Sequence, residues 1–130
     1  MKDKTYFTSR LSLAIIFFYH GLVPKLIFRN EQEVLMNDTL MPFVEKDLAL
    51  NSSGILEIIL AIALMILYRN KILLYLIIFF ATSVTLALII KLPGLFENAF
   101  NPFSLNLAVL VLCLINLFQH EKQFKGESQG

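Results

Sequence analysis

The amino-acid sequence predicts an all-α protein, an antiparallel four-helix transmembrane bundle. Composition is the first observation behind this prediction: the 130 residues are 57% hydrophobic and only 16% charged, with a mean hydropathy of +0.70. A soluble domain of this length keeps about a quarter of its residues charged. The second observation is that the apolar residues gather in four long runs. Together they predict a single membrane domain over residues 1–130, with the lipid bilayer as its first partner.

Each apolar run has about the length that a membrane helix needs, because roughly 20 residues cross the hydrocarbon layer. The predicted spans are residues 11–28, 51–68, 72–90 and 103–118. We expect residues 29–50 to form the long outer loop, and residues 119–130 to form a disordered polar tail. Asn101 and Pro102 favour a helix start before the last span, since asparagine caps helices and proline suits the first turn.

Three other classes fit the sequence poorly. A buried soluble helix is excluded for residues 72–90, which offer no polar face. A membrane β-barrel would show alternating rather than continuous apolar residues. A cleaved secretory signal is not expected either, because no small-residue cleavage site follows residues 11–28. The formal net charge of +1 gives no basic face, so no nucleic-acid partner is predicted.

The cations predict the topology. Seven of the 11 Lys and Arg residues lie on the side of the two termini, so we expect both termini in the cytoplasm. The tight turn at Asn70 predicts that the spans 51–68 and 72–90 are antiparallel neighbours. In the outer loop, the spacing of Asn30 and Glu33 is that of a capping box and predicts a short helix after it.

Polar residues within the spans are the candidates for function, because an ionisable group in hydrocarbon is costly unless it faces a partner inside the bundle. The candidate polar pocket consists of His20, Lys25, Glu57, Ser83 and Asn106. Counting from the helix midpoints places His20 near the middle of the membrane and the other side chains in its outer half. The inner half is expected to be almost pure hydrocarbon.

Pro24 and Gly21 predict a break in the first span. Proline cannot donate to the carbonyl group of His20, and its ring disfavours a regular helix there. We therefore expect the helix to kink or end between His20 and Lys25. Irregular backbone at membrane depth needs protein or a cavity around it, which suits a polar pocket.

The roles of these residues stay open at the level of sequence. Lys25 either snorkels to the interface or forms a buried ion pair. Glu57 pairs with Lys25 or His20, as a bundle lock or a pocket wall, or it transfers protons. His20 is a structural hydrogen-bond partner, a ligand or an acid/base group. Asn106 and the hydroxyl groups of the third span are expected to join helices.

Several kinds of chemistry lack their residues. Cys113 is the single cysteine, which excludes an internal disulfide. A membrane haem would want paired axial ligands, and only His20 lies inside a span. No phosphate loop or metal-ligand pattern is present, so we expect no metal and no resident cofactor. No Gly-x-x-x-Gly face predicts a dimer, which leaves the oligomeric state open.

Three segments carry a resemblance to a known family: Tyr19–Leu26, with its His-Gly-x-x-Pro-Lys motif, Gly54–Glu57 and Asn101–Leu107. Over roughly residues 9 to 118 the chain resembles the DoxX-like family of small bacterial membrane proteins. This resemblance implies a four-helix bundle in the bacterial inner membrane. Relatives include a subunit of thiosulfate:quinone oxidoreductase and partners of oxidative-stress complexes, which implies a redox partner protein. Ala61 stands where the family pattern favours glycine.

Two function classes follow. The favoured one is a non-enzymatic membrane protein that binds a lipid-like or quinone-like molecule in the polar pocket, or serves as the membrane subunit of a redox system. The alternative is a small membrane enzyme, an isomerase in which Glu57 and His20 move a proton. A channel is disfavoured, because the inner halves of the spans offer no polar lining.

Overall fold

The computed structural model describes residues 3–125, and all the regular structure in this range is helical. Four helices are long and apolar enough to cross a membrane: α1 (Lys4–His20) with the π-helix η1 (Gly21–Ile27), α3 (Lys46–Ile66), α4 (Ile72–Lys91) and α5 (Pro102–Phe124). Two shorter elements are α2 (Glu31–Leu40) and the 3₁₀-helix η2 (Pro93–Glu97). The predicted all-α fold with four membrane spans is confirmed.

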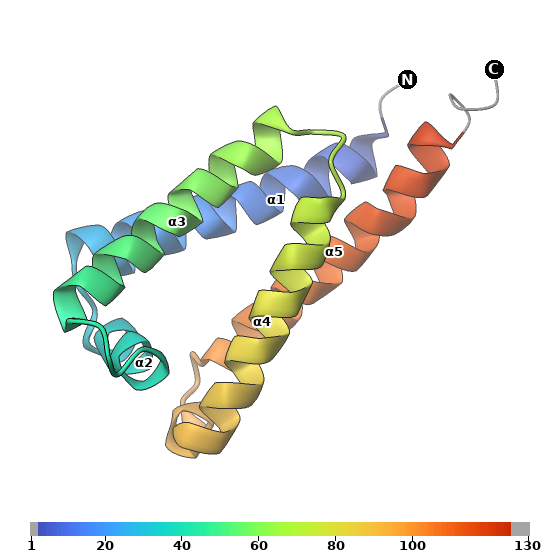
Figure 1. Cartoon of the computed structure of the whole chain (residues 1–130). Coiled ribbons are helices and arrows are strands. Elements are labelled where there is room, and N and C mark those ends of the chain that lie inside the picture. The colour runs from blue at the N-terminus through green and yellow to red at the C-terminus, as the bar shows by residue number, and fades with distance from the viewer. Residues whose placement is uncertain (1–2, 126–130) are drawn as a thin grey trace.

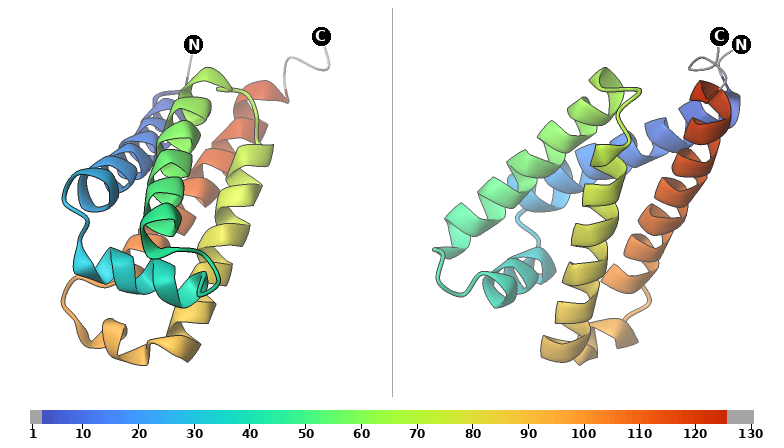
Figure 2. Two further views of the ribbon diagram at one scale, coloured as in Figure 1. Left: turned by 60° about the vertical axis from the view of Figure 1, so that its left-hand side comes forward. Right: turned by 45° about the vertical axis from the view of Figure 1, so that its right-hand side comes forward.

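The spans form two pairs that are arranged as a V (Figure 1). α1 packs along α3, α4 packs along α5, and α1 also contacts α5. The pairs meet where α1 begins and α5 ends, which we call the terminal end, and diverge towards α2 and η2, at the loop end. Figure 2 shows α2 lying crosswise at the loop end, where it contacts η1, α3 and α4.

The turn at Asn70 does not make α3 and α4 close neighbours, contrary to the sequence-based prediction. The two helices run in opposite directions but diverge from the turn, and few contacts join them (Figure 1). The side chain of Asn70 accepts a hydrogen bond of 2.7 Å from the N–H of Ile72 and starts α4. A tight turn fixes only where one helix ends and the next begins, whereas the packing of α1 against α3 and α5 sets the angle between α3 and α4.

The apolar core lies where the two pairs meet. Its buried residues come from all four spans: Leu13, Ala14, Ala61, Leu64, Leu74, Ile77, Val109 and Cys113. Many other large apolar side chains face outward, such as Phe79 and Ile90, which are 64% and 79% exposed. Apolar surface of this extent is covered by lipid tails in a membrane protein.

The short helix predicted after Asn30 is present as α2, whereas α3 begins at Lys46, inside the segment 29–50 that was predicted as the outer loop. Asn30 caps α2 by accepting a hydrogen bond of 2.9 Å from the N–H of Gln32. Glu45 caps α3 in the same way, and the N–H groups of Asp47 and Leu48 hold the pKa of its carboxyl group below the usual range. Here the capping residues extend helices into a stretch that hydropathy alone assigns to a loop.

The disordered tail predicted from residue 119 is also corrected, because α5 continues to Phe124. The ring of His120 lies 4.7 Å from that of Phe124 and 5.9 Å from that of Tyr6, so this last part of α5 packs onto α1. Residues 126–130 of that prediction lie outside the described residues.

Candidate functional site

The first span changes its helix type where Pro24 predicts an interruption. α1 ends at His20 and is followed directly by the π-helix η1. In an α-helix the proline ring would clash with the carbonyl group of His20. The π turn avoids this clash because its hydrogen bonds span one residue more, as in the 3.0 Å bond from Phe28 N to Val23 O. As a result, Lys25 lies inside the bundle and is only 7% exposed.

Two glycines bring the first span and α3 into backbone contact. A Cβ atom on Gly21 would lie 2.5 Å from the carbonyl oxygen of Gly54, and a Cβ atom on Gly54 would lie 2.8 Å from that of Gly21. Only glycine fits at either position, because both Cβ–oxygen distances are shorter than the van der Waals contact between non-bonded atoms. Lys25 follows Gly21 by one helical turn, and Glu57 follows Gly54 by one turn. The close approach therefore brings this cation and this carboxylate together.

Lys25 is buried and forms an ion cluster with two half-buried glutamates. Its Nζ atom donates to Glu57 Oε1 at 2.5 Å and lies 3.7 Å from Glu33 Oε2 of α2. The lysine side chain is 9% exposed, so it does not snorkel to the interface. The other oxygen of Glu57, Oε2, is buried and has no hydrogen-bond partner among the described residues.

A cavity of about 980 Å³ opens between the two helix pairs at the loop end. Its polar lining includes His20, Lys25, Gln32, Glu33, Ser53, Glu57, Ser83 and Asn106. Its apolar lining includes Ile16, Phe17, Phe80, Leu105 and Val109. The cavity thus combines a long apolar wall with a charged cluster at one place, which is the form of a site for an amphipathic molecule.

All five predicted pocket residues line this cavity. Of the five, Lys25 and Glu57 are joined by a hydrogen bond. Asn106 donates a hydrogen bond of 2.7 Å to the hydroxyl oxygen of Thr85, which joins α5 to α4. No hydrogen bond links His20 to Glu57 within the described residues, and the ring of His20 packs edge-on against that of Tyr19.

The family model of the DoxX-like family matches residues 14–114. The chain belongs to the DoxX-like family. The matched range contains the π turn, the ion cluster and all five predicted pocket residues. Comparison with curated proteins and with solved structures gives no significant match.

In this DoxX-like protein, sequence reasoning missed the contribution of α2 to the cavity. Gln32, Glu33 and Asn37 line it from α2, although residues 29–50 were assigned to an outer loop. The capping-box spacing of Asn30 and Glu33 was a valid signal for the helix. However, the Glu33 carboxylate lies near Lys25, a contact that spacing along the chain does not predict.

The terminal end of this DoxX-like bundle contains a second buried polar cluster, which corrects the prediction of an almost purely apolar inner half. Arg10 and Asn116 are both fully buried. The Arg10 side chain donates to the carbonyl oxygens of Leu64, Leu67 and Asn70 at 2.7, 2.6 and 3.0 Å, and to Asn116 Oδ1 at 3.1 Å. Asn116 in turn donates to Tyr6 O and Ser9 Oγ. All of these bonds are internal to the protein, so the cluster is structural.

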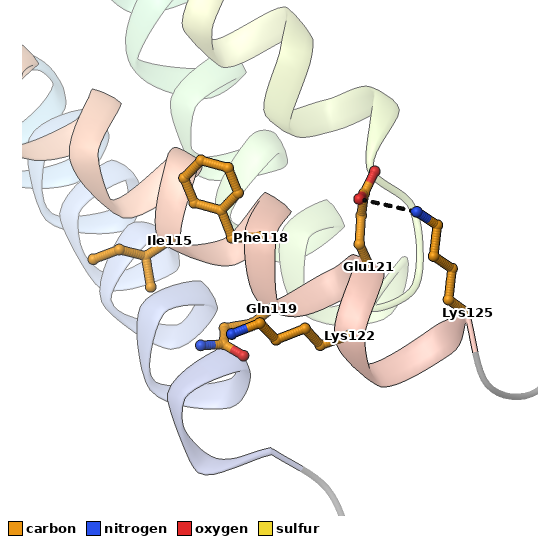
Figure 3. Close-up of a pocket in the computed structure, with 6 residues that line it drawn as sticks. All are labelled: Ile115, Phe118, Gln119, Glu121, Lys122 and Lys125. Carbon is orange, nitrogen blue, oxygen red and sulfur yellow. Dashed lines mark hydrogen bonds and ion pairs between the residues drawn. The ribbon is translucent and has the colours of Figure 1, made fainter.

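A shallow surface hollow at the terminal end offers little for function (Figure 3). It is lined by Ile115, Phe118, Gln119, Glu121, Lys122 and Lys125, all from α5 or the residue after it. Its ion pair joins the exposed side chains of Glu121 and Lys125 at 3.4 Å, one turn apart. Exposed pairs of this kind contribute little energy. Over residues 3–125, no group of three or more His, Cys, Asp or Glu residues could hold a metal ion.

The bond between Asn106 and Thr85 predicts a moderate effect on stability. Replacing Asn106 with leucine should lower the free energy of unfolding by about 1 kcal/mol, because interhelical hydrogen bonds within membranes contribute about that much. The thermal midpoint of the purified protein measures the change. Ser104→Ala is the matched control, since the Ser104 hydroxyl bonds only within its own helix start. Equal midpoints for Asn106→Leu and wild type would contradict the prediction.

Proposed function

We propose that this DoxX-like protein binds a lipid-like or quinone-like molecule in the cavity between its two helix pairs. The observation that carries the proposal is that Glu57 lines the cavity and that its Oε2 atom is buried without a partner among the described residues. A buried acceptor without a partner is costly in an apolar site. A bound head group that donates to this oxygen would remove the cost.

The shape of the bundle supports an occupant that arrives from the membrane. α3 and α4 diverge (Figure 2) and share few contacts, and residues of both helices line the cavity. The apolar wall of Phe17, Phe80 and Leu105 suits an acyl or isoprenoid chain. The polar wall at Lys25 and Glu57 suits the head group.

We further propose the inner membrane of a bacterium as the location, with both termini in the cytoplasm. α1 begins and α5 ends at the same end of the bundle (Figure 1). That end has the larger share of Lys and Arg, and each end buries one of its cations, Arg10 and Lys25, so the bias remains. Reporter fusions at the C-terminus test this: activity of a periplasmic reporter would contradict the orientation.

The isomerase alternative is supported by one observation: His20 and Glu57 line the same cavity, although no hydrogen bond joins them within the described residues. Conversion of a bound molecule, and not only its retention, would favour that alternative. A role as the membrane subunit of a redox system is supported by the family resemblance alone.

Native mass spectrometry of wild type and Glu57→Gln tests the proposal. We expect a lipid or quinone to co-purify with wild type and to be lost from the folded variant, because an amide replaces the carboxylate that receives the head group. Glu31→Gln is the matched control, since Glu31 is exposed and does not line the cavity. Folded wild-type protein that carries and accepts no such molecule would overturn the proposal.

A further inference from the structure

Two buried polar atoms of residues that line the cavity lack a partner among the described residues. One is Glu57 Oε2, an acceptor, and the other is Gln32 Nε2, a donor on α2. Both residues line the same cavity. A head group that satisfies both atoms donates one hydrogen bond to the first and accepts one from the second.

The charge around the cavity restricts the head group further. Its charged lining residues within the described chain are one lysine and two glutamates, Lys25, Glu33 and Glu57, which leaves a formal charge of −1. Lys25 already lies 2.5 Å from one carboxylate and 3.7 Å from the other. A phosphate or carboxylate head group would meet two negative side chains and a cation that is already paired, and it would also lose its hydration.

We infer that the cavity selects an uncharged, hydroxyl-bearing amphiphile over an anionic one; this inference rests on the proposed function. A hydroxyl group can donate to an acceptor such as Glu57 Oε2 and can also accept from a donor such as Gln32 Nε2. An ammonium group cannot accept, because it has no lone pair, and a quinone carbonyl cannot donate. Acylglycerols and quinols share the required hydroxyl chemistry, so both are candidate sources of the ligand.

Matched pairs of probes test the charge and the donor separately. Monooleoylglycerol and a lysophosphatidylglycerol with the same oleoyl chain differ in the phosphate. A decyl hydroquinone and the corresponding decyl quinone differ in the hydroxyl hydrogens. Binding to the full-length protein in mild detergent is measured by native mass spectrometry or by ligand-dependent shifts in thermal midpoint. Comparison of the two neutral hydroxyl probes distinguishes a lipid from a quinol as the source.

We expect monooleoylglycerol to bind at least about tenfold more tightly than the lysophosphatidylglycerol, and the hydroquinone at least about tenfold more tightly than the quinone. Gln32→Leu should weaken the binding of the hydroxyl probes by about three- to tenfold, because the hydroxyl oxygen of the probe no longer accepts a hydrogen bond from Gln32 Nε2. Glu57→Gln should reduce the discrimination against the anion, since it removes one negative charge. Glu31→Gln should behave as wild type.

The two proposals fail in different ways. If folded wild type binds none of the four probes, the proposed function is overturned. If it binds the anionic probe as tightly as the neutral one, or the quinone as tightly as the hydroquinone, the proposed function stands and the present inference is overturned. The thermal midpoint without probe verifies that each variant is folded, and Gln32→Leu provides a variant outside the ion cluster.

Discussion

Replacing Arg10 with leucine should destabilise the bundle by roughly 3 kcal/mol, among the largest single-residue effects in this protein. Its guanidinium group, on the neighbouring helix α1, donates hydrogen bonds to three backbone carbonyls at and just after the C-terminal end of α3, those of Leu64, Leu67 and Asn70. The helix dipole favours a cation beside these carbonyls, and the Leu67 carbonyl also accepts a backbone hydrogen bond of 2.9 Å from the N–H of Asn70. Leucine would remove the side-chain donor from the carbonyls of Leu64 and Asn70, and Asn116 would lose the donor to its Oδ1 atom.

Arg10→Lys and Lys4→Leu sharpen this test. The lysine variant keeps the charge, but one ammonium group cannot reach four acceptors in the forked arrangement of guanidinium, so an intermediate loss of stability is expected. Lys4→Leu removes an exposed cation from the start of the same helix and should change stability little. Thermal midpoints in one detergent measure all three variants. An Arg10→Leu protein as stable as Lys4→Leu would contradict the capping role.

Arg10 also shows where sequence reasoning ends. Hydropathy predicts the four spans, because apolar runs of that length are typical of helices that cross a membrane. The same reasoning starts the first span after Arg10 and treats this residue as a soluble flank. α1 begins at Lys4, seven residues before the predicted start at Leu11, and Arg10 is fully buried against α3 and α5. Its acceptors are more than fifty residues away in the chain, so no local pattern signals their proximity.

At the loop end, too, the sequence predicted some features of the site and missed others. An ionisable residue inside a span predicts a partner, and Pro24 predicts a change in the helix, so Lys25, Glu57 and the break were visible in the sequence. The divergence of the two helix pairs was not visible in the sequence, because it follows from the packing of all four spans together. For the same reason, the sequence did not place Gln32 and Glu33 of α2 in the cavity wall.

The close backbone contact between Gly21 and Gly54, which we call the glycine crossing, is the second place at which a large effect on stability is expected. Gly21→Ala and Gly54→Ala should each lower the free energy of unfolding by about 2–3 kcal/mol, because each methyl group clashes with a backbone carbonyl oxygen of the other helix, and only a shift of the backbone can relieve the clash. Gly94→Ala is the matched control, since a Cβ atom there has no neighbour within 4 Å. Thermal midpoints measure the three variants. Gly21→Ala and Gly54→Ala proteins as stable as Gly94→Ala would show that the crossing is looser than described.

The double variant tests how the crossing and the cavity are linked. A single methyl group already forces η1 and α3 apart, so the second one should cost less, and the combined loss should be smaller than the sum of the two. Separation of these helices also separates Lys25 from Glu57, which lie one turn beyond the two glycines. Each alanine variant that remains folded should therefore bind the hydroxyl probes more weakly than Gly94→Ala does. Unchanged probe binding in a destabilised Gly54→Ala protein would show that the ion pair adjusts independently of the crossing, and that the glycines serve stability alone.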